Sequence, residues 1–511
     1  MIRKATVDGG RVIGIPAADP RITAFKGIPF AAPPVGENRW RAPQPVVPWE
    51  GELDCSRFKP ISMQHVPGLD TNNIYSREWN VDPTIPMSED CLYLNVWTPA
   101  KTPDEKLPVF VWFFGGGLRE GNTAEMEFDG ERIARRGVVV VTVNYRLNVF
   151  GFLAHPELTA SQPDAPSNFG HLDQRAGILW ARKNIAAFGG DPDNITIGGQ
   201  SAGGGSVCAQ LTSPMTEGLF KRAVIFSGYA ASVYPIPITS TRPFSELEKQ
   251  GERFFEYLGV KTLAEARALD AVYVRDKCEA FAGSFATSPD GVFQKGYQMH
   301  NIMNGRYHRM PLIMTHTSTE FFKGIGAKDA DEFRALAEKC VGERANELMR
   351  LCGFAEGKTP DIAEANKASE VCIWETAIRA FAARRRELGI NDPLYYGVFD
   401  PSIPGWDDPG AFHSSDLWFW FETLAKCWRA FKGFHYDLSR QMCNYLTSFI
   451  KTGDPNCADN DGEAQPEWIP MTDEVPNAMR FTDAGCSCSR DDPSPVSALV
   501  AAATLDLNRG K

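Results

Sequence analysis

The sequence predicts an α/β fold, with a mostly parallel central sheet that helices cover on both faces. Short, continuous apolar runs alternate along the chain with segments of helical periodicity, and this alternation is typical of such sheets. With 511 residues, the chain is long enough to bury a sizeable core. No Ser/Gly tract, long charge block or internal repeat marks a linker, so we expect a single domain over residues 1–511.

Six apolar runs are predicted to be strands, and three periodic segments are predicted to be helices. The strands are expected over residues 108–114, 138–144, 194–200, 222–227, 311–314 and 393–399, and the helices over residues 125–136, 173–188 and 202–211. Asp173 is placed to cap the second helix, which Gly189 and Gly190 end. The pattern is irregular or purely helical in residues 227–311 and 321–388. These insertions are expected to form a lid over the carboxyl ends of the strands, where open α/β sheets place their active sites.

The formal net charge of −11 argues against two classes of partner. Nucleic acids and anionic membranes both require clustered Lys and Arg, so no nucleic acid and no membrane is expected to bind. No apolar run approaches the roughly 18 residues of a membrane-spanning helix. Residues 1–8 contain two basic side chains without a following apolar stretch, unlike a secretory signal. We expect a cytoplasmic protein; a mature secreted form and the oligomeric state are left open.

The 12 cysteines are scattered along the chain without a CxxC pair. No histidine pair has the spacing of metal ligands, and Cys486 and Cys488 are too close together for a zinc knuckle. Cysteines in helical patterns are expected to behave as small buried hydrophobes, namely Cys208, Cys372, Cys427 and Cys443. Mostly reduced thiols fit a cytoplasmic location, and neither a metal nor an organic cofactor is expected.

The strongest chemical signal is Ser201, within residues 199–203 (GQSAG). The motif lies directly between a predicted strand and a predicted helix. A serine hydroxyl becomes an effective nucleophile when a sharp turn holds it exposed, beside a base and facing an oxyanion site. Glycines two residues to either side let the strand and the helix approach closely. Ser201 is therefore the predicted nucleophile, and the competing interpretation is an ordinary glycine-rich helix start.

Residues 113–117 (FFGGG) end the first predicted strand. Consecutive glycines let backbone N–H groups point at a developing alkoxide, which favours an oxyanion hole. A phosphate-binding loop is excluded, because no Gly-Lys-Ser/Thr follows. A purely structural glycine turn is the remaining alternative.

The base for such a serine is a histidine, and in a hydrolase sheet of this type the chain order is Ser, then acid, then His. Five of the eight histidines follow Ser201: His300, His308, His316, His413 and His435. His413 lies in a glycine-bounded loop just after the strand predicted over residues 393–399, which favours it as the base. His435 lies between aromatic residues at a helix start and is expected to pack there.

The acid is the least determined of the three groups, since 64 Asp and Glu residues are present. Glu320 follows the strand predicted over residues 311–314 through a polar turn, in the right chain order. Position alone makes it a hypothesis only, because most carboxylates are solvated surface groups.

At this level of detail the chain resembles the type B carboxylesterases, the cholinesterase-like branch of the α/β-hydrolase fold. The resemblance extends from about residue 25 to residue 481. Its segments are residues 25–31 (FKGIPFA), 33–36 (PPVG), 88–96 (SEDCLYLNV), 144–146 (NYR), 168–170 (NFG), 172–174 (LDQ), 188–192 (FGGDP) and 452–456 (TGDPN).

The resemblance implies Ser201 as nucleophile, His413 as general base and then acid, and Glu320 as the carboxylate that orients it. It further implies oxyanion donors at the backbone N–H groups of Gly116, Gly117 and Ala202. Ser227 matches a position that supports the acid, and two pairs match structural salt bridges, Arg39 with Glu89 and Arg146 with Asp173.

Three departures from the family pattern bear on the substrate and on disulfides. Gln200 replaces the Glu that usually precedes the nucleophile, which removes a negative charge and weakens the case for cationic choline esters. Leu118 stands where a Phe commonly follows the triple glycine, so a differently shaped acyl pocket is expected. Ser62 occupies about the place of the family's disulfide partner for Cys91, and Cys55 is displaced, so this disulfide is not expected.

Aromatic residues near the predicted site have two interpretations. Trp418 and its aromatic neighbours follow His413 and form either a pocket wall or ordinary helix packing. Trp374, Phe113 and Phe114 share this ambiguity, and Phe114 adjoins the glycine loop and is the better prediction for a substrate contact.

The sequence thus predicts a serine hydrolase of neutral carboxylic esters that works through an acyl-enzyme. The alternatives are a hydrolase specialised for an amide, a lactone or a bulky natural-product ester, and, more distantly, a non-catalytic binding module of the cholinesterase-like fold. Because the base must be neutral, activity is expected to fall as the pH drops below about 6 to 7.

Overall fold

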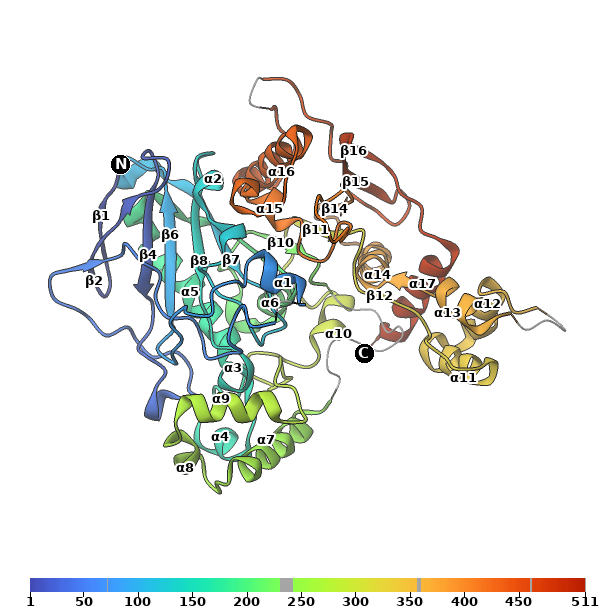
Figure 1. Ribbon diagram of the computed structural model, residues 1–511, viewed down its shortest axis with the longest axis horizontal. Coiled ribbons are helices and arrows are strands. Elements are labelled where there is room, and N and C mark those ends of the chain that lie inside the picture. The colour runs from blue at the N-terminus through green and yellow to red at the C-terminus, as the bar shows by residue number, and fades with distance from the viewer. Residues whose placement is uncertain (71, 230–241, 356–359, 460–461, 511) are drawn as a thin grey trace.

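The computed structural model describes residues 1–70, 72–229, 242–355, 360–459 and 462–510. Its centre is an 11-stranded sheet in which the strands from β8 to β15 run parallel and antiparallel strands lie at both edges (Figure 1). From edge to edge the order is β16 (Gly485–Arg490), β15 (Asn477–Thr482), β14 (Leu394–Phe399), β11 (Leu312–Thr317), β10 (Arg222–Phe226), β9 (Gly190–Gln200), β7 (Leu107–Phe113), β8 (Val139–Val143), β6 (Tyr93–Thr98), β4 (Thr23–Pro29) and β3 (Ile15–Pro16).

Two small sheets accompany the central one. The first joins β1 (Lys4–Val7), β2 (Gly10–Ile13) and β5 (Glu52–Asp54), and the second joins β12 (Phe322–Lys323) and β13 (Val371–Cys372).

Helices cover both faces of the central sheet, and the side chains of each strand alternate between the two. One face packs against α2 (Glu131–Ala134) and α16 (Gly433–Thr452), and the other against α5 (Phe169–Asn184), α6 (Ala202–Thr212) and α14 (Ile373–Glu387). Within β7, Phe110 and Trp112 belong to one hydrophobic cluster, whereas Val109 and Val111 belong to the other. This period-two division of a fully buried strand is what a sheet covered on both sides requires.

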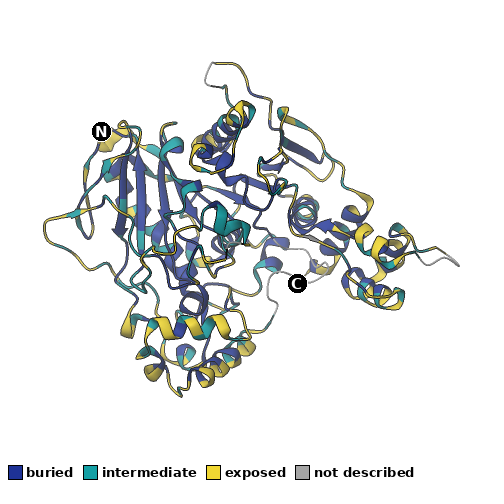
Figure 2. Ribbon diagram, in the orientation of Figure 1, coloured by how far each residue is buried: buried dark blue, intermediate teal, exposed yellow. Residues whose placement is uncertain are grey.

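The remaining helices lie around this core or outside it. They are α1 (Ile74–Glu78), α3 (Asn148–Phe152), α4 (Pro156–Ser161), α7 (Phe244–Leu258), α8 (Leu263–Arg267), α9 (Ala271–Ala280), α10 (Gln298–Met303), α11 (Ala330–Val341), α12 (Ala345–Leu351), α13 (Ile362–Ala368), α15 (Leu417–Trp420) and α17 (Pro495–Asn508). Figure 2 shows buried residues along the central strands and exposed residues on the outer helices such as α7 and α11. In the part of the chain that the structure describes, no helix combines the length and apolar character needed to cross a bilayer.

All six predicted strands are present, as β7, β8, β9, β10, β11 and β14. The prediction missed the antiparallel strands at both edges of the sheet. Edge strands are half exposed, so their sequences mix polar and apolar residues; β16, for example, reads GCSCSR. The prediction of a single domain over residues 1–511 remains a prediction, although strands from both ends of the chain join one sheet.

The helix predicted over residues 202–211 is confirmed as α6, but the other two differ from expectation. Residues 125–136 are interrupted, with a 3-10 turn at Met126–Phe128 and a short α2, because the Asp129 side chain accepts the backbone N–H of Glu131 and starts a new turn. The helix predicted to start at Asp173 begins at Phe169 instead. Gly189 ends this helical segment in the left-handed conformation, as expected.

Asp173 does not cap a helix, because its carboxylate is fully buried against Arg146. The two side chains form an ion pair at 2.7 Å, and the backbone N–H of Arg146 also donates to Asp173 at 3.0 Å. Arg39 and Glu89 pair in the same way at 2.6 Å. Both salt bridges that the resemblance implied are therefore present and tie loops to the core.

The insertions form only part of the predicted lid. Residues 286–289 and 294–299 from the first insertion, and Phe321 and Trp374 from the second, line a cavity beside Ser201. The helices α7 and α9 pack on each other at one flank, and α11 and α12 pack on α17 at another. Residues 230–241 and 356–359 of these insertions lie outside the described residues.

Candidate active site

Ser201 lies at the sharp turn between β9 and α6. Its backbone has φ 54° and ψ −124°, a conformation that few residues other than glycine adopt. The surrounding hydrogen bonds maintain this strain, since the Ser201 N–H donates to Phe226 O at 2.9 Å and its carbonyl accepts from Gly205 N at 2.9 Å. The turn raises the side chain above the carboxyl end of the sheet.

The glycines on either side of Ser201 are required by close packing. A β carbon on Gly199 would lie 2.3 Å from the carbonyl oxygen of Gly203, and one on Gly203 would lie 2.1 Å from that of Phe113. No side chain fits at either position without moving backbone. The short approach of strand to helix that the motif predicted is therefore present.

The residues predicted as oxyanion donors line the two cavities that also contain Ser201. Gly116 and Gly117 have φ of +98° and +66°, and a β carbon on Gly115 would lie 3.1 Å from that of Ser201. Among the described residues, the N–H groups of Gly116 and Gly117 have no protein acceptor. Ala202 is the first residue of α6, so its N–H is one of the unbonded donors of a helix start.

Backbone pairing brings the predicted acid and base together. Thr319 and Phe412 form a parallel bridge, and the Thr319 N–H donates to Ala411 O at 3.0 Å. The residues that follow, Glu320 and His413, consequently face each other, with His413 Nδ1 2.7 Å from Glu320 Oε2. Both side chains are buried.

Four donors surround the Glu320 carboxylate. Besides His413, the Ser227 hydroxyl donates to Oε1 at 2.6 Å, the Thr317 N–H donates to Oε1 at 3.1 Å, and Trp374 Nε1 donates to Oε2 at 3.0 Å. Burial raises the pKa of Glu320, but the charge and hydrogen bond of His413 and the hydrogen bond of Ser227 outweigh it and lower that pKa to about 2. The group therefore stays ionised at neutral pH.

An ionised Glu320 fixes the tautomer of His413. A carboxylate only accepts, so Nδ1 of His413 carries the proton and Nε2 is left as an acceptor. The side-chain nitrogen of Gln200 lies 3.3 Å from this Nε2. Chemically, a neutral imidazole whose Nε2 carries no proton is the form that can accept a proton from a serine hydroxyl.

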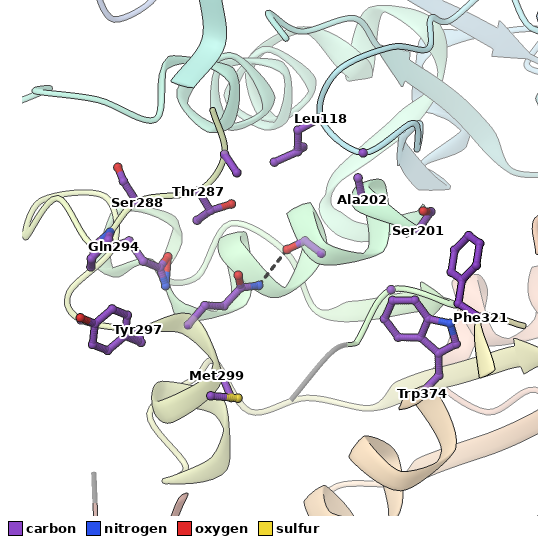
Figure 3. A pocket seen from close by; sticks show the side chains of 17 residues that line it. Leu118, Ser201, Ala202, Thr287, Ser288, Gln294, Tyr297, Met299, Phe321 and Trp374 are labelled. Atoms are coloured by element: carbon purple, nitrogen blue, oxygen red, sulfur yellow. Dashed lines mark hydrogen bonds between the residues drawn. The ribbon is translucent and has the colours of Figure 1, made fainter. Parts of the chain in front are cut away.

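Two cavities open at Ser201. The first, which we call the apolar pocket, has a volume of about 360 Å³ and extends from Ser201 and Trp374 toward Ser288 and Tyr297 (Figure 3). The second, the polar pocket, has a volume of about 330 Å³. Residues that distinguish the apolar pocket are Leu118, Gly205, Thr287, Met299 and Trp374, and those that distinguish the polar pocket are Glu120, Glu125, Glu127, Gln200 and His413.

The structure corrects two of the four predicted pocket residues. Leu118 lines the apolar pocket and Gln200 lines the polar pocket. Phe114, however, is fully buried and stacks on Tyr145 with ring centroids 4.3 Å apart. Trp418 is also buried, 6.1 Å from the ring of Trp79, and lines neither pocket. Both rings belong to one hydrophobic cluster of the core.

Phe321 and two glutamates of the polar pocket, the half-buried Glu125 and the buried Glu127, were not predicted. Phe321 is 46% exposed, lines both pockets and lies 4.6 Å from the His413 ring. Glu125 and Glu127 were assigned to a helix, and nothing in their spacing indicated burial. The position of Phe321 directly after the predicted acid was the one available signal.

Neither a metal site nor a disulfide is evident in the described part of the chain. There, no three His, Cys, Asp or Glu side chains are grouped as metal ligands. The cysteines are free thiols, including Cys55 and Cys91.

Comparison with known proteins identifies the family. The model of the carboxylesterase family matches residues 2–332 and 360–495. The chain belongs to the carboxylesterase family. It is accordingly a carboxylic ester hydrolase, with the α/β-hydrolase fold that its solved relatives share.

Several relatives support this assignment. The chain is 31% identical to the para-nitrobenzyl esterase of Bacillus subtilis, over 88% of this chain and 90% of that protein. It is 39% identical to a medium-chain fatty acyl-CoA hydrolase precursor of Anas platyrhynchos, over 90% and 84%. It is also 34% identical to the fumonisin B1 esterase of Sphingopyxis macrogoltabida, but that match covers 64% of this chain and 59% of the relative.

Solved structures agree with the sequence relatives. Two structures of PNB esterase superpose with TM-scores of 0.78 and 0.77, at 27% and 28% identity. Each covers 98% of this chain, and this chain covers 99% and 100% of them. The chain thus has the fold of these solved esterases over nearly its whole length.

Proposed function

We propose that this carboxylesterase hydrolyses its ester through an acyl-enzyme, with Ser201 as the nucleophile, His413 as general base and then acid, and Glu320 as the orienting carboxylate. The observation that carries the proposal is the 2.7 Å contact of His413 Nδ1 with Glu320, in a cavity wall that also contains Ser201. Ser227 supports the acid through its hydroxyl.

The reaction proceeds in two halves. His413 Nε2 takes the proton of Ser201, whose Oγ attacks the ester carbonyl, and the oxyanion accepts from the N–H groups of Gly116, Gly117 and Ala202. The tetrahedral intermediate collapses when its C–O bond breaks and His413 gives its proton to the leaving alcohol. Water then attacks the acyl-Ser201 ester with His413 again as base, which releases the acid and restores the serine.

The substrate is proposed from the pockets and from what the relatives act on. The apolar pocket fits a carbon chain, which favours neutral carboxylic esters. A bulky natural-product ester is a second candidate, because a relative is named fumonisin B1 esterase and because two pockets rather than one open at Ser201. A cytoplasmic location, suggested by the free thiols, is part of the proposal.

The test is hydrolysis of p-nitrophenyl esters from acetate to octanoate by the wild type and by Ser201→Ala. Removal of the nucleophile of a serine triad lowers turnover by about 10⁶. We expect a loss of this order, and the preferred acyl length reports the size of the acyl pocket. Turnover by Ser201→Ala within tenfold of the wild type contradicts the proposal.

Covalent labelling separates the enzyme from a binding-only protein of the same fold. An organophosphonate reacts with a serine only if that serine is activated, so the wild type is expected to gain one phosphonyl group at Ser201. A folded wild type that neither turns over an ester nor is labelled is a binding protein.

A further inference from the structure

The two pockets serve different halves of the ester, if the proposed function holds. The leaving alcohol receives its proton from His413 Nε2 and must therefore lie on the side of that residue. His413 lines the polar pocket but not the apolar one. The alcohol moiety consequently occupies the polar pocket, and the acyl group, which stays bound to Ser201, extends into the apolar pocket.

A pair of carboxyl groups lies in the wall of the polar pocket. Glu125 is half-buried and accepts the backbone N–H of Asn122 at 2.9 Å. Glu127 is only 1% exposed, and among the described residues its Oε2 has no hydrogen-bond donor. The two carboxyl groups contact each other through a hydrogen bond, which requires a shared proton.

No basic side chain compensates this pair within the described residues. Glu78, the next nearest carboxylate to Glu127, is bound to Arg429 at 2.7 Å, so that arginine is already engaged. Arg119 lines the same cavity, but its side chain is exposed and its neighbour in the chain, Glu120, carries the opposite charge. The described wall of the cavity therefore holds three carboxyl groups and one exposed guanidinium.

Burial without a cationic partner has a measurable consequence. Desolvation raises the pKa of both Glu125 and Glu127, and the neighbouring carboxyls of Glu125 and Glu78 raise the pKa of Glu127 further. An unpaired buried carboxylate costs several kcal/mol. A ligand group that brings both positive charge and N–H donors would relieve that cost.

We propose that the polar pocket binds an alcohol moiety bearing a protonated primary amine, whose N–H groups donate to the carboxyls of Glu125 and Glu127. An ammonium group offers three donors, and hydrogen bonds to charged groups are among the strongest in proteins. A quaternary ammonium has no N–H to donate and is a poorer match. The substrate class is therefore esters of amino alcohols, with the amine and the ester separated by a short carbon chain.

The test compares butyrate esters that differ only at the end of the alcohol. Each ω-aminoalkyl butyrate, with an alcohol of four to six carbons, is paired with the n-alkyl butyrate in which CH₃ replaces NH₃⁺. The wild type is expected to prefer the best amine over its neutral partner by at least about tenfold in kcat/KM. The N,N,N-trimethylammonium analogue is expected to lose most of that preference.

Two variants and a control locate the effect. Glu127→Gln and the double variant Glu125→Gln/Glu127→Gln are expected to reduce the amine-to-alkyl ratio of kcat/KM at least about fivefold. The ratio, rather than either rate, is the readout, so a general loss of activity does not imitate the effect. Glu256→Gln, on the exposed face of α7 and outside both pockets, is expected to keep the wild-type ratio.

The outcomes separate this inference from the proposed function. Equal turnover of the amine and alkyl esters by the wild type overturns the amine subsite but leaves the esterase intact. An amine preference that the double variant retains overturns the assignment to Glu125 and Glu127. If a variant fails to fold, the wild type alone decides the question. Its hydrolysis of butyrate esters is inhibited competitively with 6-aminohexan-1-ol and, separately, with heptan-1-ol, and the amino alcohol is expected to be the stronger inhibitor. Equal inhibition by the two alcohols overturns the inference. Failure of every ester contradicts the proposed function instead.

Discussion

The apolar and polar pockets share Ser201, Gly117 and Phe321 but differ in almost every other respect. The apolar pocket is lined by insertion residues such as Thr287 and Met299, and none of the described residues that line it is charged. The polar pocket is lined largely by the segment between β7 and α2, which contributes three glutamates.

This contrast predicts that the two pockets select two parts of the substrate independently of each other. Carbon chains gain from burial at roughly 25 cal/mol per Å² of apolar surface, so the apolar pocket selects by size. Buried carboxyls select by charge and by hydrogen-bond donors, because unpaired groups are costly. Changes confined to one pocket should therefore alter one half of the substrate preference and leave the other unchanged.

The largest expected effect comes from filling the apolar pocket through Gly205. A β carbon at this position has a single neighbour, the Gly228 carbonyl oxygen at 3.8 Å, so a side chain fits without a backbone clash. Gly205→Leu is expected to lower kcat/KM for p-nitrophenyl octanoate about 100-fold relative to the acetate, since one methylene in such a pocket changes discrimination by 10- to 200-fold. The measurement is kcat/KM of the wild type and the variant for p-nitrophenyl esters from acetate to octanoate.

Gly205→Ala is the matched control, and it adds only the β carbon. It is expected to keep the octanoate-to-acetate ratio within about threefold and to stabilise α6 by about 0.5–1 kcal/mol. The amine-to-alkyl ratio should be unchanged in both variants. A leucine variant that still prefers octanoate would show that the acyl chain does not lie against α6.

Acidification is expected to weaken the wall of the apolar pocket through His171. This buried imidazole contacts the Thr287 hydroxyl at 2.7 Å, and burial lowers its pKa to about 4, although the hydrogen bond to Gln174 Oε1 opposes this shift. An unfolded histidine has a pKa of about 6.5, so below that pH the unfolded chain binds a proton that the folded protein does not. Stability is thus lost as the pH falls from about 6.5 toward 4.

His171 should therefore account for about 2 kcal/mol of the stability lost between pH 7 and pH 5. The measurement is equilibrium urea unfolding of the wild type and of His171→Gln at both pH values. The variant is expected to show a smaller difference between the two pH values, whatever its stability at pH 7. Parallel losses in both proteins would rule out this histidine as the cause.

The smallest expected effect concerns Gln200, at the boundary between the polar pocket and the base. Gln200→Glu places a carboxylate about where the amide now lies, 3.3 Å from His413 Nε2. Because that charge stabilises the imidazolium, the acidic limb of the kcat/KM profile should move to higher pH by about 0.5–1 unit. Glu320, with its pKa near 2, stays ionised throughout and contributes no limb of its own. Superimposable profiles from pH 5 to 9 would contradict this account.

The sequence predicted the parallel strands because they are buried on both faces and read as continuous apolar runs. The strand β7, Leu107–Phe113, is an uninterrupted example with the sequence LPVFVWF. It did not predict β15 and β16, whose neighbours in the sheet are set by tertiary contacts rather than by local pattern. The start of α5 was misplaced for a related reason, since Asp173 has the chemistry of a cap but is used by Arg146 instead.

In the candidate site, too, some residues could be predicted from local sequence and others depend on tertiary contacts. Ser201, Glu320 and His413 lie at strand ends in a fixed chain order, so sequence position alone pointed to them, and their roles remain proposals. Glu125 and Glu127 could not be predicted, because a carboxylate in a helical pattern is normally solvated and only the folded chain buries it. Phe114 and Trp418 were wrong because large aromatic residues fill cores more often than they line cavities.

The short backbone bridge between Thr319 and Phe412 has a practical consequence for engineering. It fixes the loops of Glu320 and His413 to each other without any contribution from the stretch of residues 286–299, nine of which line the apolar pocket. That stretch can accordingly be exchanged for its counterpart from a related esterase, or randomised in a library, while the hydrolytic machinery stays in register. We expect the preference for acyl-chain length to be transferred together with this one stretch.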